Sequence, residues 1–403
     1  MRLMRGLREL KKLLLLLVSL AFLQASGREY LNDEQNKILG LEQDIDAINS
    51  TSLKYNWIEP VVASYTYSKN DQMGEFTSSK YYKVSLNQPI FKSGGIYFAI
   101  KYADANEEFK SIATSMKHQG LIKRLYELVL NLQKADFQLS QVKLKIQNSD
   151  IDISRKKQRF LSGDDDISFL NRAMLEKNRL KVSKLTIKSN RLKLINSYKN
   201  LSNIAYSKIK LPELKLIDKN EFIRKNLSLK LQKSNVKQIN SLKNMTISNY
   251  LPTFSLFGDY NYKEDEAPLF RSAKSEYRSY GIRVSMPLLA INRSRDIEVK
   301  KLEVLKEKLA LKQKQKDIVS EYQNILLDNE MLVEKLSTLS LSIELYKSLV
   351  KSTRDGVKAG DKTTLDLKTA KNSMKSLELD YFITQVDIKL NILKLFEKMS
   401  DEI

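Results

Sequence analysis

The sequence contains the same pattern twice, and this internal repeat constrains the fold more than any other feature. Gly163 aligns with Gly360 at an offset of 197 residues, and Pro89 aligns with Pro287 at an offset of 198 residues. Each half therefore predicts the same order of elements: a short helix, two strands, a long helix, a turn that contains glycine, and a second long helix. Two landmarks at nearly equal offsets favour an internal tandem duplication.

The sequence predicts three parts of the chain: an N-terminal signal segment and two structural repeats. Residues 1–27 resemble a signal peptide, because a basic stretch precedes the apolar run Leu13–Leu23, which is too short to span a bilayer. Small residues follow at 25–27, as cleavage requires; a short N-terminal membrane anchor is the alternative. The first repeat covers 28–210, with a strand pair at about 59–91 and a helical hairpin at about 96–206 whose tip is near 163. The second repeat covers 211–403, with a strand pair at about 252–289 and a hairpin at about 293–398 whose tip is near 360.

The predicted strands alternate between apolar and polar residues. Tyr65 and Tyr67 alternate with serine and threonine, and in the second half Tyr280, Ile282 and Val284 alternate with polar residues and glycine. Period-two alternation gives a sheet an apolar, aromatic face and a polar face, which is typical of a barrel with lipid outside and water inside. An ordinary sandwich with an apolar core is the alternative.

Four strands do not close a barrel, since the smallest natural barrels have about 8. The strands of one chain therefore either pack against another element or combine with those of other subunits. After the signal segment no 18 consecutive apolar residues occur, so a closed barrel is the structure that would hold this chain in a membrane. Residues 70–74 and 263–268 are predicted to be loops, and Trp57 is predicted to anchor the rim of the barrel.

The predicted helices carry apolar residues at alternating spacings of 3 and 4. Residues 125–146 and 318–350 show this heptad pattern, which winds helices around each other. No proline occurs between Pro89 and Pro212, so a helix from 96 to 160 would be about 100 Å long at about 1.5 Å per residue. Taken alone, the helices favour a dimeric coiled coil; the alternating strands argue against it.

Acidic residues cluster where the predicted helices turn back. The glycines at the tips supply a left-handed C-cap, and the acidic residues after them are suited to capping the next helix. Asp366 is set apart because it is predicted to lie inside the helix, beyond the first cap position. If several chains converge at the tip, its carboxylate would be repeated around a pore mouth and would attract cations. The cluster consists of Asp164, Asp165, Asp166, Asp361 and Asp366.

The composition argues against an enzyme. With no Cys and one His, the chain offers no Cys/His metal cluster and no Cys nucleophile. Gly94 and Gly95 lack the Lys-Ser/Thr pair of a phosphate-binding loop, so no cofactor is predicted. The net charge of +21 is spread over all the helices, which indicates a solvated surface and no nucleic-acid partner.

At residues 360–370 the sequence resembles the TolC-type outer-membrane efflux proteins. After Gly360, Thr363 follows three residues on, Asp366 six on and Ala370 ten on, as in the pattern of that family. The strand-to-helix junction at 88–95 is a second likeness, carried by Pro89, Phe91, Gly94 and Gly95, and Pro287 repeats it weakly. The resemblance covers about residues 40–398.

This resemblance implies an α+β membrane protein that forms a homotrimer. Three chains of four strands would give a 12-stranded barrel in the outer membrane, in contact with its lipid, and long antiparallel hairpins would form a tunnel through the periplasm. The chain would be a passive exit duct of a tripartite efflux or type I secretion system. Its partners would be a periplasmic adaptor and an inner-membrane transporter.

The resemblance also assigns roles at the tips. It implies a pore constriction or gate at Asp366, Lys362 and Thr369, although Val357 and Lys362 replace the aromatic and Arg that help to close the tunnel in many members. Adaptor docking is expected at both tips. The alternative function for the chain is that of a periplasmic coiled-coil adaptor or scaffold, although such a protein usually carries one hairpin. The expected docking residues are Gly163, Asp164, Asp165, Asp166, Gly360, Asp361 and Thr363.

Overall fold

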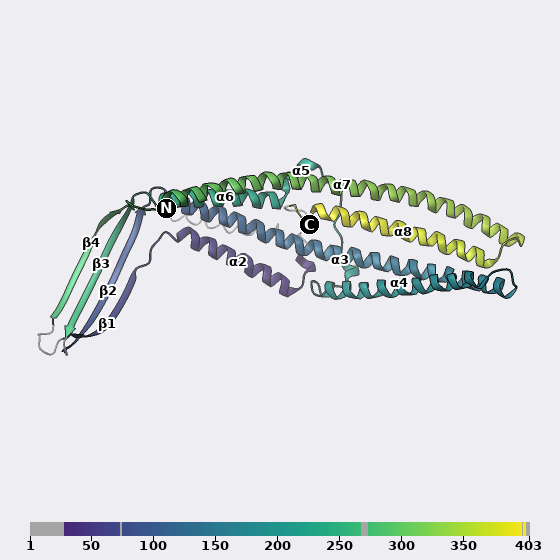
Figure 1. Cartoon of the computed structure of the whole chain (residues 1–403), viewed down its shortest axis with the longest axis horizontal. Helices are drawn as coiled ribbons and strands as arrows, with labels where there is room; N and C mark the ends of the chain where they lie inside the picture. The colour runs from purple at the N-terminus through teal and green to yellow at the C-terminus, as the bar shows by residue number, and fades with distance from the viewer. Residues whose placement is uncertain (1–27, 73–74, 267–272, 397, 400–403) are drawn as a thin grey trace, which may run out of the picture. The chain divides into compact units, whose positions relative to one another are not determined.

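The structure is a computed structural model that describes residues 28–72, 75–266, 273–396 and 398–399 (Figure 1). The expected signal peptide therefore lies outside the described residues. The chain divides into two compact units: one from Leu41–Thr114 and Ser228–Lys316, the other from the described parts of Met1–Gly40, Ser115–Leu227 and Asp317–Ile403. We call them the sheet unit and the tip unit.

Both halves of the chain contain helix, strand pair, long helix and shorter helix in the same order. The long helices α3 and α7 have 67 residues each, and the helices that follow them, α4 and α8, have 33 residues each. The helices are α2 (Asp33–Tyr55), α3 (Gly95–Leu161), α4 (Ile167–Lys199), α5 (Lys219–Lys225), α6 (Leu227–Ser248), α7 (Arg293–Ala359) and α8 (Thr364–Phe396), and the strands are β1 (Val62–Gln72), β2 (Glu75–Phe91), β3 (Thr253–Glu266) and β4 (Ala273–Ser285).

The sheet has the strand order β1-β2-β3-β4, and all its pairs are antiparallel. The strands have 11, 17, 14 and 13 residues. The prediction that 70–74 and 263–268 are loops was wrong for residues 70–72 and 263–266. These residues are polar, but their backbone groups pair across the strands, and this pairing extends the hairpins.

The register places the predicted apolar residues on one face of the sheet. Tyr65 pairs with Tyr82, and Tyr82 pairs with Tyr262, so the three rings lie side by side at centroid distances of 4.8 and 5.9 Å. The other face carries hydroxyl, amide and charged groups, with Tyr81 donating a hydrogen bond of 2.5 Å to Asn261. The alternation read from the sequence thus corresponds to two chemically different faces.

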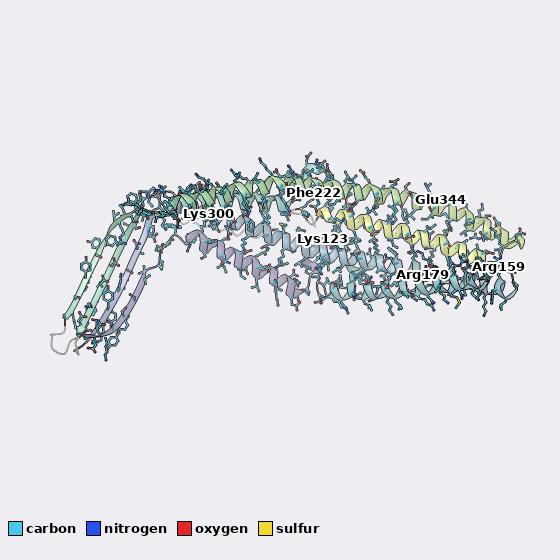
Figure 2. The ribbon with its side chains drawn as sticks, viewed as in Figure 1. Lys123, Arg159, Arg179, Phe222, Lys300 and Glu344 are labelled. Atoms are coloured by element: carbon cyan, nitrogen blue, oxygen red, sulfur yellow. The ribbon has the colours of Figure 1, made fainter. Side chains whose placement is uncertain are left out.

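In the tip unit four helices lie side by side in the order α4, α3, α8, α7 (Figure 1). Contacts fix this order: Lys177 of α4 pairs with Asp150 of α3 at 2.6 Å, and Asn391 of α8 donates to the Ile325 carbonyl of α7 at 2.8 Å. Leu125 and Leu132 of the α3 seam are fully buried, each contributing about 1.5–3 kcal/mol. Short α5 adds Phe222, whose ring lies 5.6 Å from that of Tyr322 (Figure 2).

Among the described helices, none combines the length and the low polarity that a bilayer crossing requires.

Candidate functional site

The two hairpin tips share one backbone design. Gly163 has φ of 79° and Gly360 has φ of 88°, the left-handed region that glycine adopts without strain. After each glycine the next residue donates its N–H to a carbonyl five residues back, Asp164 to Arg159 and Asp361 to Gly356. The glycine N–H itself bonds three residues back. This is the Schellman arrangement, which ends both long helices in the same way.

The acidic residues of the first tip have local partners. Asp166 is the N-cap of α4 and accepts a hydrogen bond of 2.8 Å from the Ser168 N–H, which lowers the pKa of its carboxyl. Asp165 pairs with Arg159 at 3.2 Å, and Asp164 accepts from the Ser162 hydroxyl at 2.7 Å. These carboxylates therefore hold the turn together, as the capping interpretation expected.

At the second tip Asp366 is part of a cap. The Thr363 N–H and hydroxyl both donate to Asp366 Oδ2, at 2.8 and 2.7 Å, and the Asp366 N–H donates back to Thr363 Oγ1 at 3.2 Å. This reciprocal pattern is a capping box. Asp366 lies inside α8 as its third residue, as the sequence predicted, but it also caps the helix from within and so is not set apart from the capping carboxylates.

Asp366 also forms an ion pair with Arg155 of α3. The hydrogen bonds from Thr363, and to a lesser extent Arg155, hold the pKa of Asp366 below its usual range. The carboxylate is therefore held by partners on α3 and at the start of α8 and is not a free group. Arg155 was not identified from the sequence.

Arg155 belongs to a polar ladder that joins the two hairpins of one chain. Four residues of α3 spaced seven apart face α8: Lys134 pairs with Asp387 at 2.6 Å, and Gln141 and Asn148 donate to carbonyls of α8 at 3.2 and 3.3 Å. Arg155 is the fourth. A seven-residue repeat of polar residues beside the apolar seam was the sequence signal for this ladder.

The other two predicted gate residues make different contacts. The stem of Lys362 lies against Gly356, where an added Cβ would approach its Cδ and Cγ at 3.2 Å. The Thr369 hydroxyl donates to the Leu365 carbonyl at 2.9 Å, and the Thr369 carbonyl accepts from Asn148 at 3.3 Å. Of the three residues, only Asp366 forms an ion pair across the hairpins, so a gate at this tip stays a prediction.

The two strand-to-helix junctions differ. In the first, β2 bulges at Pro89, Phe91 packs on Phe254 at 5.7 Å, and the chain enters α3 directly through Ser93 and Gly94, which have φ of 45° and 87°. A Cβ on Gly95 would lie 2.5 Å from Ser248 Oγ, so the glycine allows α3 and α6 to approach closely.

In the second junction no residue has positive φ. The chain continues beyond Pro287 without regular structure as far as α7, which begins at Arg293.

The outer helices of the tip unit are chemically unlike. Helix α4 carries nine basic residues and one acidic residue, and it exposes apolar side chains such as Val182 and Leu185, which are 62 and 66% exposed. Residues 317–359 of α7 carry seven acidic and five basic residues and expose Leu341 and Leu345 at 66 and 72%. Arg179 and Glu344 mark the two helices in Figure 2. Both helices thus have apolar positions that are not covered within the chain.

In the part of the chain that the structure describes, no three His, Cys, Asp or Glu side chains gather in a way that would hold a metal ion.

Comparison with known proteins identifies the fold. No family model matches the sequence, and no curated protein matches it. Among solved structures, the channel protein CusC superposes with a TM-score of 0.69 at 12% identity, covering 91% of this chain and 88% of CusC.

Two further outer-membrane proteins give similar values. The outer-membrane channel CmeC of Campylobacter jejuni has a TM-score of 0.67 at 14% identity, covering 93% of this chain and 85% of CmeC. The outer-membrane protein VceC of Vibrio cholerae has a TM-score of 0.68 at 10% identity, covering 91 and 94%. The predicted TolC-type fold is confirmed: nearly the whole chain has the fold of these three proteins.

Proposed function

From this fold, which the chain shares with outer-membrane efflux channels, we propose that it is one protomer of a homotrimeric channel in the outer membrane with a periplasmic helical tunnel. The observation that carries the proposal is the sheet: four strands with two unpaired edges and an apolar face that the chain leaves open. The protomer would serve as the passive exit duct of a tripartite efflux or type I secretion system.

The exposed face of the sheet suits contact with lipid. Tyr280, Ile282 and Val284 of β4 are 89, 68 and 60% exposed, and Tyr65 of β1 is 56% exposed. Burying such a face in hydrocarbon removes it from water, whereas the opposite face, with its serines, Asn261 and Asp259, suits a water-filled lumen. An ordinary sandwich would need a second layer over the apolar face.

Closure of the sheet supports a trimer. The edges β1 and β4 have unpaired backbone groups, which in lipid must be satisfied by another strand. Joining β4 of one copy to β1 of the next satisfies both edges, and three copies give 12 strands, an even number within the range of natural barrels.

The outer helices of the tip unit also suit contact between neighbouring copies. Helix α4 is strongly basic. Residues 317–359 of α7 carry more acidic than basic residues, and both helices expose apolar positions. In a ring of copies, α4 at one side of the tip unit would lie beside α7 at the other side of the tip unit of the adjacent copy. Apolar positions flanked by opposite charges would then form a coiled-coil seam between subunits.

We infer that the chain arose by internal tandem duplication. Equal lengths of 67 and 33 residues for the paired helices and the identical Schellman turns support it. Six hairpins around a threefold axis would then form a tunnel with quasi-sixfold regularity.

The tips would form the inner end of this tunnel. Asp366, with Lys362 and Thr369 nearby, would be repeated around the constriction, and a ring of ionised carboxylates would attract cations. The acidic turns at Gly163 and Gly360 would dock a periplasmic adaptor, and the energy for transport would come from an inner-membrane partner.

The test is the conductance of single channels formed by the purified protein in a planar bilayer. We expect stable cation-preferring channels in the wild type, and a weaker cation preference in Asp366→Asn, which keeps an oxygen acceptor for the cap. Asp361→Asn is the matched control, because it removes a tip carboxylate that makes no capping box.

Stable channels that respond equally to both substitutions would keep the duct and discard the Asp366 ring. Membrane-extracted trimers that never conduct would overturn the channel and favour the scaffold.

A further inference from the structure

The second strand-to-helix junction holds three aliphatic side chains almost entirely in solvent. Leu288, Leu289 and Ile291 are 89, 90 and 84% exposed. Exposed leucines are common one at a time, but three within four residues form a contiguous apolar surface, and such surfaces mark contacts with partners. We call residues 287–291 the apolar hook.

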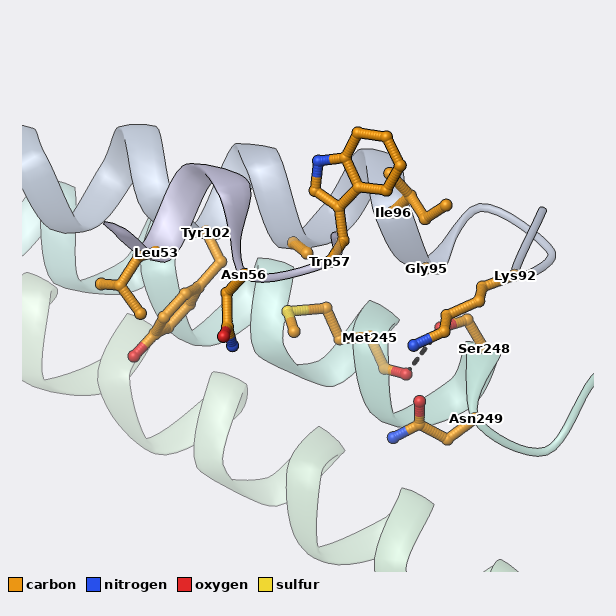
Figure 3. A pocket seen from close by; sticks show the side chains of 11 residues that line it. Leu53, Asn56, Trp57, Lys92, Gly95, Ile96, Tyr102, Met245, Ser248 and Asn249 are labelled. Atoms are coloured by element: carbon orange, nitrogen blue, oxygen red, sulfur yellow. Dashed lines mark hydrogen bonds between the residues drawn. The ribbon is translucent and has the colours of Figure 1, made fainter. Parts of the chain in front are cut away.

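A cavity of about 260 Å³ lies at the first junction (Figure 3). Its walls are apolar, with Leu53, Trp57, Ile96 and Met245 among them, and Asn56 and Lys92 add polar groups. We call it the junction pocket. A water molecule occupies about 30 Å³ of liquid, so the pocket has room for aliphatic side chains.

The repeat explains why one junction forms a pocket and the other a hook. Gly94 and Gly95 let the first junction turn tightly, so that α3 runs close against α6 beside the pocket. The corresponding residues of the second half are Asn292 and Arg293, and there the chain projects before α7 begins. The first half therefore has an apolar pocket at its junction, and the second half has a projecting apolar segment.

The sheet topology puts the apolar hook and the junction pocket at the same end of the sheet. Val62 begins β1 and pairs with Ser85 near the end of β2, whereas Ser285 ends β4 and pairs with Thr253 at the start of β3. The start of β1 and the end of β4 therefore lie at the same end of the sheet, on opposite edges. The hook begins two residues after Ser285, and Trp57 precedes β1 by a few residues.

We propose that the apolar hook of one copy inserts into the junction pocket of the next copy. This inference rests on the proposed edge-to-edge trimer and names a contact that would fix it. Leu288 and Leu289 would fill the apolar part of the pocket. The Lys92 ammonium, which pairs with no carboxylate of the described residues, would donate to carbonyls of the irregular hook backbone.

Because the chain has no cysteine, a disulfide can form only between cysteines that are introduced by substitution. Full-length chains with Asn56→Cys and chains with Leu289→Cys, carrying different tags, are co-expressed, extracted and oxidised. A disulfide needs Cα atoms within about 7 Å, so it reports direct contact. We expect a cross-linked pair that carries both tags. Since each chain has one cysteine, that product is intermolecular.

Ile45→Cys is the matched control for Asn56→Cys. Ile45 lies on α2, which ends one residue before Asn56; it is 55% exposed and is eleven residues from Asn56. Chains with Ile45→Cys should give no product with Leu289→Cys, because the pocket is three turns away.

The outcomes separate the inference from the function on which it rests. Intact trimers without the Asn56–Leu289 cross-link, or with an equal yield from Ile45→Cys, would overturn the hook and leave the channel. Wild-type protein that forms no oligomer would overturn both. As a second measurement, Trp57 is the only tryptophan, and its quenching by acrylamide should rise at least twofold in trimers of Leu288→Gln/Leu289→Gln.

Discussion

The two hairpin tips have the same backbone and different chemistry. Gly163 and Gly360 both adopt positive φ and close the same pair of hydrogen bonds. In the first tip a single aspartate, Asp166, caps the next helix; in the second a capping box joins Thr363 to Asp366, which reaches Arg155 on the other hairpin. The position of Asp366 in the first tip is occupied by Phe169, whose ring lies 4.7 Å from Arg172.

The junctions differ even in the backbone. Tight turning through Gly94 and Gly95 is kept only in the first half. The comparison teaches that the two halves have the same glycines at the ends of their long helices and differ at positions where a side chain decides the local contacts.

The largest expected effect is at the first junction. Gly95→Ala places a Cβ 2.5 Å from Ser248 Oγ and 3.1 Å from Lys92 Cβ, so the Ser248 side chain must turn away or α3 and α6 must move apart. Overpacking of this kind costs about 2–3 kcal/mol. The free energy of unfolding, followed by Trp57 fluorescence in detergent, measures the loss. Arg293→Ala, at the aligned position of the second half, should change stability by less than about 0.5 kcal/mol.

A double variant sharpens this prediction. Ser248→Ala removes the nearest obstructing atom and should restore part of the stability of Gly95→Ala. Equal losses in the single and double variants would contradict the proposed clash.

The two tip glycines should behave alike. Gly163→Ala and Gly360→Ala each force an L-residue into the left-handed region, which costs about 1–2 kcal/mol. No atom lies within 4 Å of an added Cβ at either position, so the backbone alone sets the loss. Gly120→Ala is the control: it lies inside α3, has open space around it, and should gain up to about 1 kcal/mol. Thermal unfolding of the three variants compares them, and unequal losses at the tips would break the equivalence.

The sequence predicted features that depend on local or periodic rules. Gly163 and Gly360 marked the turns because only glycine adopts their φ freely, and the alternation around Tyr65 and Tyr82 marked one face of the sheet because strand geometry requires it. The resemblance at 360–370 then led to the fold that the solved structures confirm.

The sequence did not predict which distant residues meet. Arg155 and Asp366 are 211 residues apart, and their ion pair depends on α3 lying beside α8, which the heptad patterns do not specify. The strand ends were missed for a similar reason: Asn70 and Asp71 have low strand propensity, but pairing with the partner strand outweighs it. The sequence does not predict the apolar hook, because its leucines have the same residue type as core leucines and only their exposure distinguishes them.

A smaller effect is expected at the capping box. Thr363→Val removes the hydroxyl that bonds Asp366 and should cost about 1 kcal/mol at pH 7. Because the folded-state pKa of Asp366 is lowered, its contribution is present above the unfolded value of about 3.9 and is lost as pH falls through the lowered pKa. At pH values below about 4, the thermal unfolding midpoint of the wild type should therefore decrease more steeply with falling pH than that of Thr363→Val. Parallel curves would show that Thr363 does not set the pKa.

The smallest expected effect concerns the link between the hairpins. Arg155→Gln removes one member of an ion pair whose side chains are 38 and 34% exposed, so the loss should be below about 1 kcal/mol and should shrink further in high salt. The Asp366 pKa should stay mostly lowered, because the hydrogen bonds from Thr363 are the larger cause and remain. Lys156→Gln is the control, since that residue pairs within its own helix. A loss that is independent of salt, or a pH profile equal to that of Thr363→Val, would mean that Arg155 and the cap act as one unit, and that the second tip is built around the contact between the hairpins.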